Sequence, residues 1–97
     1  MEGHSVISPD VLARYAADAA REVRGVHGLV GRNDGVKVVR DERVAVELHL
    51  ALDRGANAGT VGAAVQAHVA DCLARMADVR PDTVDVIVDE WHSASPA

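Results

Sequence analysis

The side chains that could do chemistry in this chain are few, and the most suggestive pair is His68 and Cys72. Four residues separate them, so on a helix both project from one face and could supply two ligands to a transition metal. Such a site needs a third and a fourth donor, and none lies nearby in the sequence. Because both positions continue an apolar stripe, we expect them to belong to the core, with Cys72 a buried and unreactive thiol. No metal or other cofactor is predicted.

A second group surrounds His49, which alternates with Glu47 along an expected strand and could approach Asp85 or Asp89 of another strand. An imidazole beside carboxylates titrates close to neutral pH, since the ordinary pKa of histidine is about 6.5, so this group could respond to pH. A small enzyme or ligand-binding domain could use His49 with Glu47 or Asp85, provided that they converge in a concave pocket. The other interpretation is that His49 is a solvated strand residue.

Other motifs that carry chemistry are incomplete. No Gly-x-Ser-x-Gly elbow accompanies any serine, so hydrolase chemistry is disfavoured. The segment 55–62 has the place of an anion-binding loop before a helix, but it lacks the phosphate-loop lysine and the Gly-x-Gly-x-x-Gly spacing. The segment 25–28 imitates the Gly-x-x-Gly loop of a KH module, without a basic residue inside it or an aromatic platform for bases. We predict no catalytic residues and keep a KH-like RNA binder as an alternative.

Composition indicates one small acidic domain. The chain has 97 residues, of which 48% are hydrophobic, and its mean hydropathy is close to zero. Fifteen acidic residues outnumber ten basic ones without a basic cluster, so binding to nucleic acid is not expected. No run is apolar enough to span a bilayer, and nothing near Met1 resembles an export signal. We expect a cytoplasmic protein without direct membrane insertion.

The core must be built from small and branched side chains, because phenylalanine is absent. Burial per residue is then modest, and stability is expected to depend on an oligomer or a partner. We take residues 7–91 as a single domain, residues 1–6 as a leader and residues 92–97 as a flexible tail.

Two amphipathic helices are expected. The first begins at Pro9 after the capping hydroxyl of Ser8 and ends at Gly25, with an ion pair between Arg14 and Asp18 on its exposed face. The second runs roughly over 60–76, with Asp71–Arg75 as its exposed pair. Its apolar stripe comprises Val61, Ala64, Val65, His68, Val69, Cys72, Leu73 and Met76.

The alternating segments predict strands around Leu29 and over 36–39, 44–52 and 84–89. We expect a three-residue turn over 40–42, which sets Val38 opposite Val44. The passage from 44 to 88 is strand, helix and strand, so its two strands should be parallel through a right-handed crossover. The predicted fold is an α+β two-layer sandwich, in which a small mixed sheet of a hairpin plus a parallel strand carries two helices on one face.

The other face of this sheet is then open, and it is the best candidate for function. Apolar side chains alternate there with charged ones, and a tryptophan lies at one end, which is typical of an interface. Trp91 could instead fold over the sheet edge or cap the core. The candidate partner interface comprises Val39, Glu47, His49, Ile87 and Trp91.

The segment Glu22-Val-Arg-Gly-Val26, after an alanine-rich helix opening with Ile7-Ser8, resembles the alkaline shock protein family. The resemblance continues in the strand 44–52, in Arg54-Gly55, in Val65, Gln66 and Val69 of the second helix, and in the strand 84–88. It covers roughly residues 7–91, and its specificity lies in the order and spacing of short motifs.

This resemblance implies a non-enzymatic, self-associating protein of Gram-positive bacteria that is linked to cell-envelope stress. The family offers no catalytic residues to transfer. It implies a homo-oligomer, a small membrane-anchored protein partner, and a place in the cytoplasm peripheral to the membrane.

Overall fold

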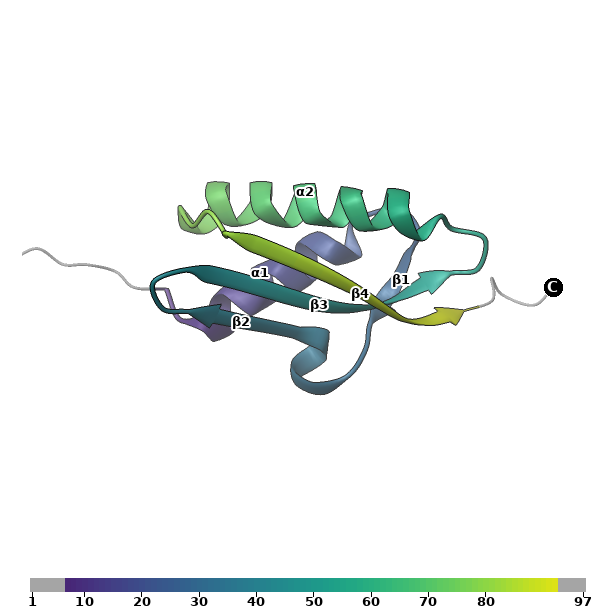
Figure 1. Ribbon diagram of the computed structural model, residues 1–97, viewed down its shortest axis with the longest axis horizontal. Helices are drawn as coiled ribbons and strands as arrows, with labels where there is room; N and C mark the ends of the chain where they lie inside the picture. The colour runs from purple at the N-terminus through teal and green to yellow at the C-terminus, as the bar shows by residue number, and fades with distance from the viewer. Residues whose placement is uncertain (1–6, 93–97) are drawn as a thin grey trace, which may run out of the picture.

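The computed structural model describes residues 7–92, so the expected leader and residues 93–97 of the expected tail lie outside the described residues. The elements, in chain order, are α1 (Pro9–Arg21), β1 (Val26–Leu29), a short 3-10 helix η1 (Arg32–Gly35), β2 (Val36–Arg40), β3 (Val44–Asp53), α2 (Ala58–Ala77) and β4 (Thr83–His92) (Figure 1). Two helices and a four-stranded sheet confirm the predicted α+β class.

Helix α1 begins as predicted. The Ser8 hydroxyl oxygen accepts a hydrogen bond from the Val11 N–H at 3.3 Å, and proline follows at the first helical position. The helix ends earlier than predicted, with Glu22 as its last capping residue. Gly25 instead shapes the turn into β1: its φ is +99°, and a Cβ there would lie 2.8 Å from the Val61 side chain. The predicted pair with Arg14 is wrong, since Asp18 pairs with Arg21 at 3.2 Å.

Helix α2 is longer than predicted and buries half of the predicted stripe. Its first turn is capped by Asn57, whose side-chain oxygen accepts from the Thr60 N–H at 2.9 Å. The exposed Asp71–Arg75 pair is confirmed at 2.8 Å. The predictions for Ala64 and Met76 are wrong, because Ala64 is exposed and the Met76 side chain is 56% exposed. Val79 is buried after the helix end, so the chain that folds back covers this part of the core. The fully buried members of the stripe are Val65, Val69 and Leu73, and Val61 is nearly so.

Strand β3 is the centre of the sheet. Strands β1 and β2 pair with it antiparallel, one after the other along the same edge, and β4 pairs with it in parallel along the other edge. Since β3 contacts every other strand, its side chains set both faces of the sheet. Those that face the helices are fully buried or nearly so: Val46, Leu48, Leu50 and Leu52.

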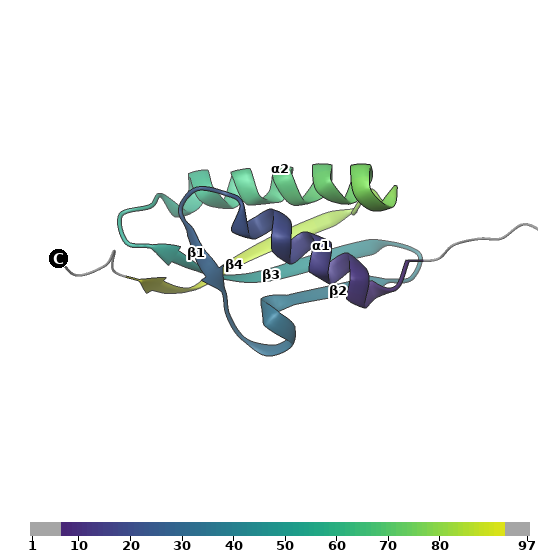
Figure 2. The ribbon, with the colours of Figure 1, turned by 180° about the vertical axis from the view of Figure 1, so that it is seen from behind.

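Both helices cover this buried face. Helix α1 crosses the strands on one side, behind them in Figure 1 and in front of them in Figure 2, and α2 runs beside α1 along β4. The buried side chains of the two helices and of β3 form one cluster, with Leu12 and Ala16 from α1 and Val65 from α2. The predicted two-layer arrangement with an open sheet face is what positions the candidate site.

The hairpin between β2 and β3 has the predicted turn length and a shifted register. Its turn is Asp41 to Arg43, and Val38 lies opposite Val46 instead of Val44. The turn is fixed by the Asp41 carboxylate, which accepts from the Arg43 N–H at 3.0 Å. The predicted register is therefore wrong by two residues. A shift of two keeps each side chain on its predicted face, because side chains alternate with period two.

An irregularity in β4 changes the predicted face of Trp91. The pairing with β3 shifts between Leu50 and Ala51, where Asp89 is the additional residue of a β-bulge. After the bulge, Trp91 pairs with Leu52, a buried core residue. Paired residues project to the same side of a sheet, so Trp91 lies on the helix side. The prediction that Trp91 lies on the open face, which assumed uninterrupted alternation, is therefore wrong.

Candidate functional site

The open face of the sheet brings His49 between two carboxylates. Its Nε2 lies 2.8 Å from Oε2 of Glu47 on the same strand, and its Nδ1 lies 2.6 Å from Oδ2 of Asp89 on β4. Asp85 lies opposite Glu47, whereas Asp89 is the additional residue of the bulge and is the carboxylate that contacts His49. About a third of the His49 side chain and slightly less than half of each carboxylate are exposed.

Two carboxylate contacts favour the imidazolium form of His49. Both ring nitrogens can donate only when the ring is protonated. The hydrogen bond to Glu47, followed by the one to Asp89, raises the pKa of His49 above its ordinary value, against a smaller opposing effect of desolvation. Of the two interpretations of His49, the structure thus favours a contact with carboxylates, with Glu47 and Asp89 as its partners.

A second histidine group, which the sequence analysis missed, lies where β1, β3 and β4 meet. The rings of His27 and His92 are stacked with centroids 4.2 Å apart and an angle of 3° between their planes. His27 Nδ1 lies 3.4 Å from a carboxylate oxygen of Asp53, and His92 Nε2 lies 2.9 Å from one of Glu90. His92 is the last residue of β4, whereas the sequence analysis assigned it to the tail. Its nearness to His27 follows from a strand pairing that no local pattern gives.

The open face also carries exposed apolar surface. Val39 of β2 is 44% exposed, and Ile87 of β4 is partly exposed opposite His49. Trp91 is 51% exposed, although the bulge has moved it to the other side of the sheet. The structure thus unites Val39, Glu47, His49 and Ile87 on one surface and separates Trp91 from them.

This surface is shallow. The hollow on it, between Lys37, Val39, Glu47 and Asp85, has a volume of only about 100 Å³. A groove of about 380 Å³ lies elsewhere, between α1 and β2, and none of the residues around His49 lines it. A site for a small molecule needs convergent polar groups inside a concave pocket. The geometry around His49 does not meet that requirement.

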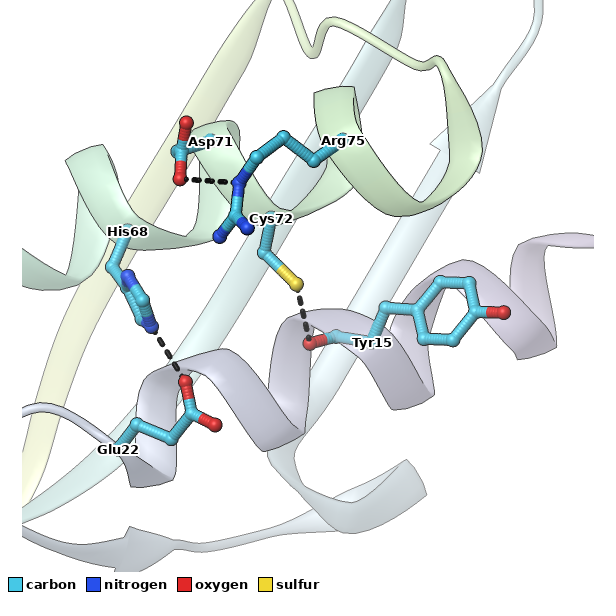
Figure 3. Close-up of polar contacts among 6 residues, drawn as sticks. All are labelled: Tyr15, Glu22, His68, Asp71, Cys72 and Arg75. Carbon is cyan, nitrogen blue, oxygen red and sulfur yellow. Dashed lines mark hydrogen bonds and ion pairs between the residues drawn. The ribbon is translucent and has the colours of Figure 1, made fainter.

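The His68 and Cys72 pair bridges the two helices (Figure 3). His68 is half-buried, and its Nε2 lies 2.6 Å from Oε1 of Glu22, just after α1. The Cys72 thiol points to the backbone carbonyl of Tyr15 at 3.9 Å. Burial raises the pKa of Cys72, which favours the neutral thiol. The expectation that His68 is simply a core side chain is therefore incomplete, since it links α2 to the end of α1.

Two further observations concern classes of site considered above. Within residues 7–92, no three or more His, Cys, Asp and Glu side chains are grouped so that they could hold a metal ion. Over the same residues, neither helix combines the length and the apolar character that crossing a membrane would take. The segment 25–28 is also not a loop between helices, because most of it belongs to β1.

Comparison with known proteins gives one family and one group of solved structures. Residues 1–92 match the family model of the alkaline shock protein 23 family, which is described by a cell envelope-related function. No curated protein matches the chain.

Among solved structures, the chain is similar to the MamM CTD. A cadmium form of one variant has a TM-score of 0.67 and 18% identity, with 88% of this chain and 100% of that chain covered. A zinc form of another variant has a TM-score of 0.64 and 17% identity, with 86% of each chain covered. At such identities the likeness shows a shared fold.

Proposed function

Since the chain belongs to the alkaline shock protein 23 family, whose function is related to the cell envelope, we propose that it serves the envelope as a non-enzymatic, self-associating scaffold. In this proposal, the protein works in the cytoplasm during the envelope stress response. It reaches the membrane through a small membrane-anchored partner. Protein–protein contacts, and not a reaction, are its activity.

The observation that carries this proposal is the uncovered face of the sheet. Both helices lie on the opposite face, and exposed apolar side chains at Val39 and Ile87 remain beside the charged group around His49. Surfaces that mix exposed apolar side chains with a polar surround are typical of protein interfaces. The shallow relief supports a macromolecular partner over a small molecule, which needs a deeper pocket.

The alternatives have less support. An enzyme or ligand-binding domain built on His49 with Glu47 would need those groups to converge in a cleft, and the hollow beside them holds only about 100 Å³. An RNA-binding role would need a basic surface, whereas the chain is acidic and its Gly25 to Gly28 segment runs into a strand.

The scaffold proposal is tested by Ile87→Asp, which places a charge on the open face without altering the core. We expect a lower weight-average mass than that of the wild type in size-exclusion chromatography with light scattering, because a desolvated charge opposes contact at this surface. Met76→Asp is the matched control, since it adds the same charge to an exposed apolar position on α2. Equal association of both variants and the wild type would contradict a contact through the open face.

The link to the envelope is tested in the native cell. We expect the wild type in the membrane fraction together with a small integral membrane protein, and Ile87→Asp largely in the supernatant. Met76→Asp should fractionate like the wild type. Recovery of the wild type entirely in the supernatant under envelope stress would contradict the proposed attachment.

A further inference from the structure

The outer strands of the sheet each leave a row of main-chain groups without a strand partner. Among residues 7–92, β2 and β4 pair only with β3, and they lie on its two opposite edges. A free edge is a template for another strand. Strand β1 also pairs only with β3 within these residues, on the same side as β2, so the sheet has a free edge on each side, and the longer strands on them are β2 and β4.

The direction of the free groups follows from two hydrogen bonds. On β4, the Val84 carbonyl accepts from the Gln66 side chain at 2.9 Å, so it points away from β3. Main-chain groups alternate in direction along a strand, so the N–H and carbonyl groups of Val86 and Val88 also point away from β3. Gln66 covers the edge only at Val84.

On β2, the Val36 N–H donates to the Asn33 carbonyl of η1, so Val36 also points away from β3. By the same alternation, Val38 and Arg40 turn their main-chain N–H and carbonyl groups outward. Each edge thus has two residues, two positions apart, whose main-chain groups are free to bond to another strand: Val38 and Arg40 on β2, and Val86 and Val88 on β4.

The two edges carry opposite charge. Strand β2 contains Lys37 and Arg40 and no carboxylate, whereas β4 contains Asp85, Asp89 and Glu90 and no lysine or arginine. Pairing of two β4 strands would bring like charges together, which opposes association. Pairing of β2 with β4 brings opposite charges together, so the edges suit each other better than they suit themselves.

We propose that β2 of one copy of the chain pairs antiparallel with β4 of a second copy, which extends the sheet across molecules. This names the contact behind the self-association of the proposed function, and it rests on that function. In this pairing Val38 lies opposite Val88 and Arg40 opposite Val86, so the free main-chain N–H and carbonyl groups of the two edges can bond to each other. The antiparallel direction keeps the helices of both copies on the same side of the extended sheet.

The same register matches the side chains on the open face. Val39 of one copy lies opposite Ile87 of the second, which joins two partly exposed apolar side chains. Lys37 lies opposite Asp89, where the bulge also brings Glu90 close. A single register thus allows the main-chain hydrogen bonds, the contact between Val39 and Ile87, and the ion pair between Lys37 and Asp89.

The groove between α1 and β2 leaves the β2 edge accessible. It holds about 380 Å³ and is lined by Val36, Lys37 and Val38 together with Arg14 and Arg21 of α1. The carboxylates Asp10 and Asp34 also line it, so the positive excess is modest. Because each copy has one edge of each kind on opposite sides, the contact is head-to-tail, and such contacts grow into open assemblies or rings instead of stopping at dimers.

Charge reversal with complementation tests this pairing on the full chain. By sedimentation velocity at low salt, we expect Lys37→Glu and Asp89→Lys each to raise the apparent dissociation constant about tenfold, because an attraction becomes a repulsion. An equimolar mixture of the two variants should regain the association of the wild type, since every interface in an alternating assembly is again complementary. Asp85→Lys is the matched control: it makes the same charge change on the same strand, without a basic partner in this register, and should not weaken association.

Each result decides between the two proposals. Recovery in the mixture supports the edge pairing and also shows that the single variants are folded. If the wild type associates but the single reversals have no effect, or the mixture stays as dissociated as its components, the edge pairing is wrong while self-association stands. A wild type that is monomeric at every concentration would overturn self-association itself.

Discussion

At the scale of residues, the arrangement around His49 couples protonation to structure. The sequence placed His49 beside Glu47, because residues two apart on a strand share a face. It left the second partner open between Asp85 and Asp89, because both lie two residues from Ile87, which is the residue opposite His49. The stack of His27 and His92 was not predicted, because it depends on the pairing of both β1 and β4 with β3. The hydrophobic periodicity of single segments does not indicate which strands pair.

The raised pKa of His49 predicts a pH dependence with a definite sign. A histidine whose pKa is higher in the folded state stabilises the fold fully below its unfolded pKa, about 6.5, and loses that contribution as the pH rises through the folded pKa. We therefore expect the free energy of unfolding to fall as the pH rises above about 6.5, and His49→Gln to flatten this slope.

Urea denaturation at several pH values measures this dependence. His68→Gln is the control, because His68 also contacts a carboxylate but lies in the helix layer, away from the open face of the sheet. A slope that persists unchanged in His49→Gln would show that other groups cause it. Lys37 and Asp85 also line the open face, so the two variants should be compared at the same ionic strength.

At the scale of elements, the sequence predicted the kinds and order of helices and strands well, because caps and periodicity are local. Ser8 begins α1 and the apolar stripe defines α2. The hairpin register was missed, since a shift of two residues preserves the faces and hydrophobic pattern cannot detect it. The side chain of Asp82, which accepts from the Val44 N–H at 2.7 Å, and the Asp41 turn select the observed register through contacts that patterning ignores.

The join between η1 and β2 depends on Gly35. Its φ is +78°, and a Cβ there would lie 2.7 Å from the Val30 carbonyl oxygen and 3.0 Å from the His49 carbonyl oxygen. Both neighbours are main-chain atoms, so they cannot move aside cheaply. We expect Gly35→Ala to lower the free energy of unfolding by about 2 to 4 kcal/mol through clash and backbone strain.

Gly28→Ala is the matched control in the neighbouring strand, because a Cβ there meets nothing within 4 Å. It should be neutral or stabilising by up to about 1 kcal/mol, since alanine restricts the unfolded chain more than glycine does. Chemical denaturation of both variants measures the difference. Equal effects would show that the close contacts at Gly35 are relieved without cost.

At the scale of the whole molecule, the two-layer arrangement was predictable because two helices with one apolar stripe each must share the apolar side of one sheet. What the sequence could not supply was the side on which Trp91 lies, since one extra residue in β4 reverses the alternation after it. The candidate surface is consequently smaller than predicted at that end and is centred on β2, β3 and the middle of β4.

The single core predicts a single unfolding transition. Trp91 is the only tryptophan, so its fluorescence reports on β4, while far-ultraviolet circular dichroism reports mainly on the two helices. Because β4 and both helices contribute to one cluster, we expect the two signals to have the same midpoint in urea. An earlier midpoint for Trp91 would mean that β4 separates before the remaining core unfolds. Dilute samples keep self-association out of the comparison.

The central position of β3 also sets an order of events during synthesis. Strands β1 and β2 precede it, so one side of β3 can be paired as soon as it leaves the ribosome. Its other side waits until α2 and then β4 have been translated. In that interval the nascent chain presents the flank of a hydrophobic strand, the kind of surface on which chaperones act and misassembly between neighbouring polysomes begins.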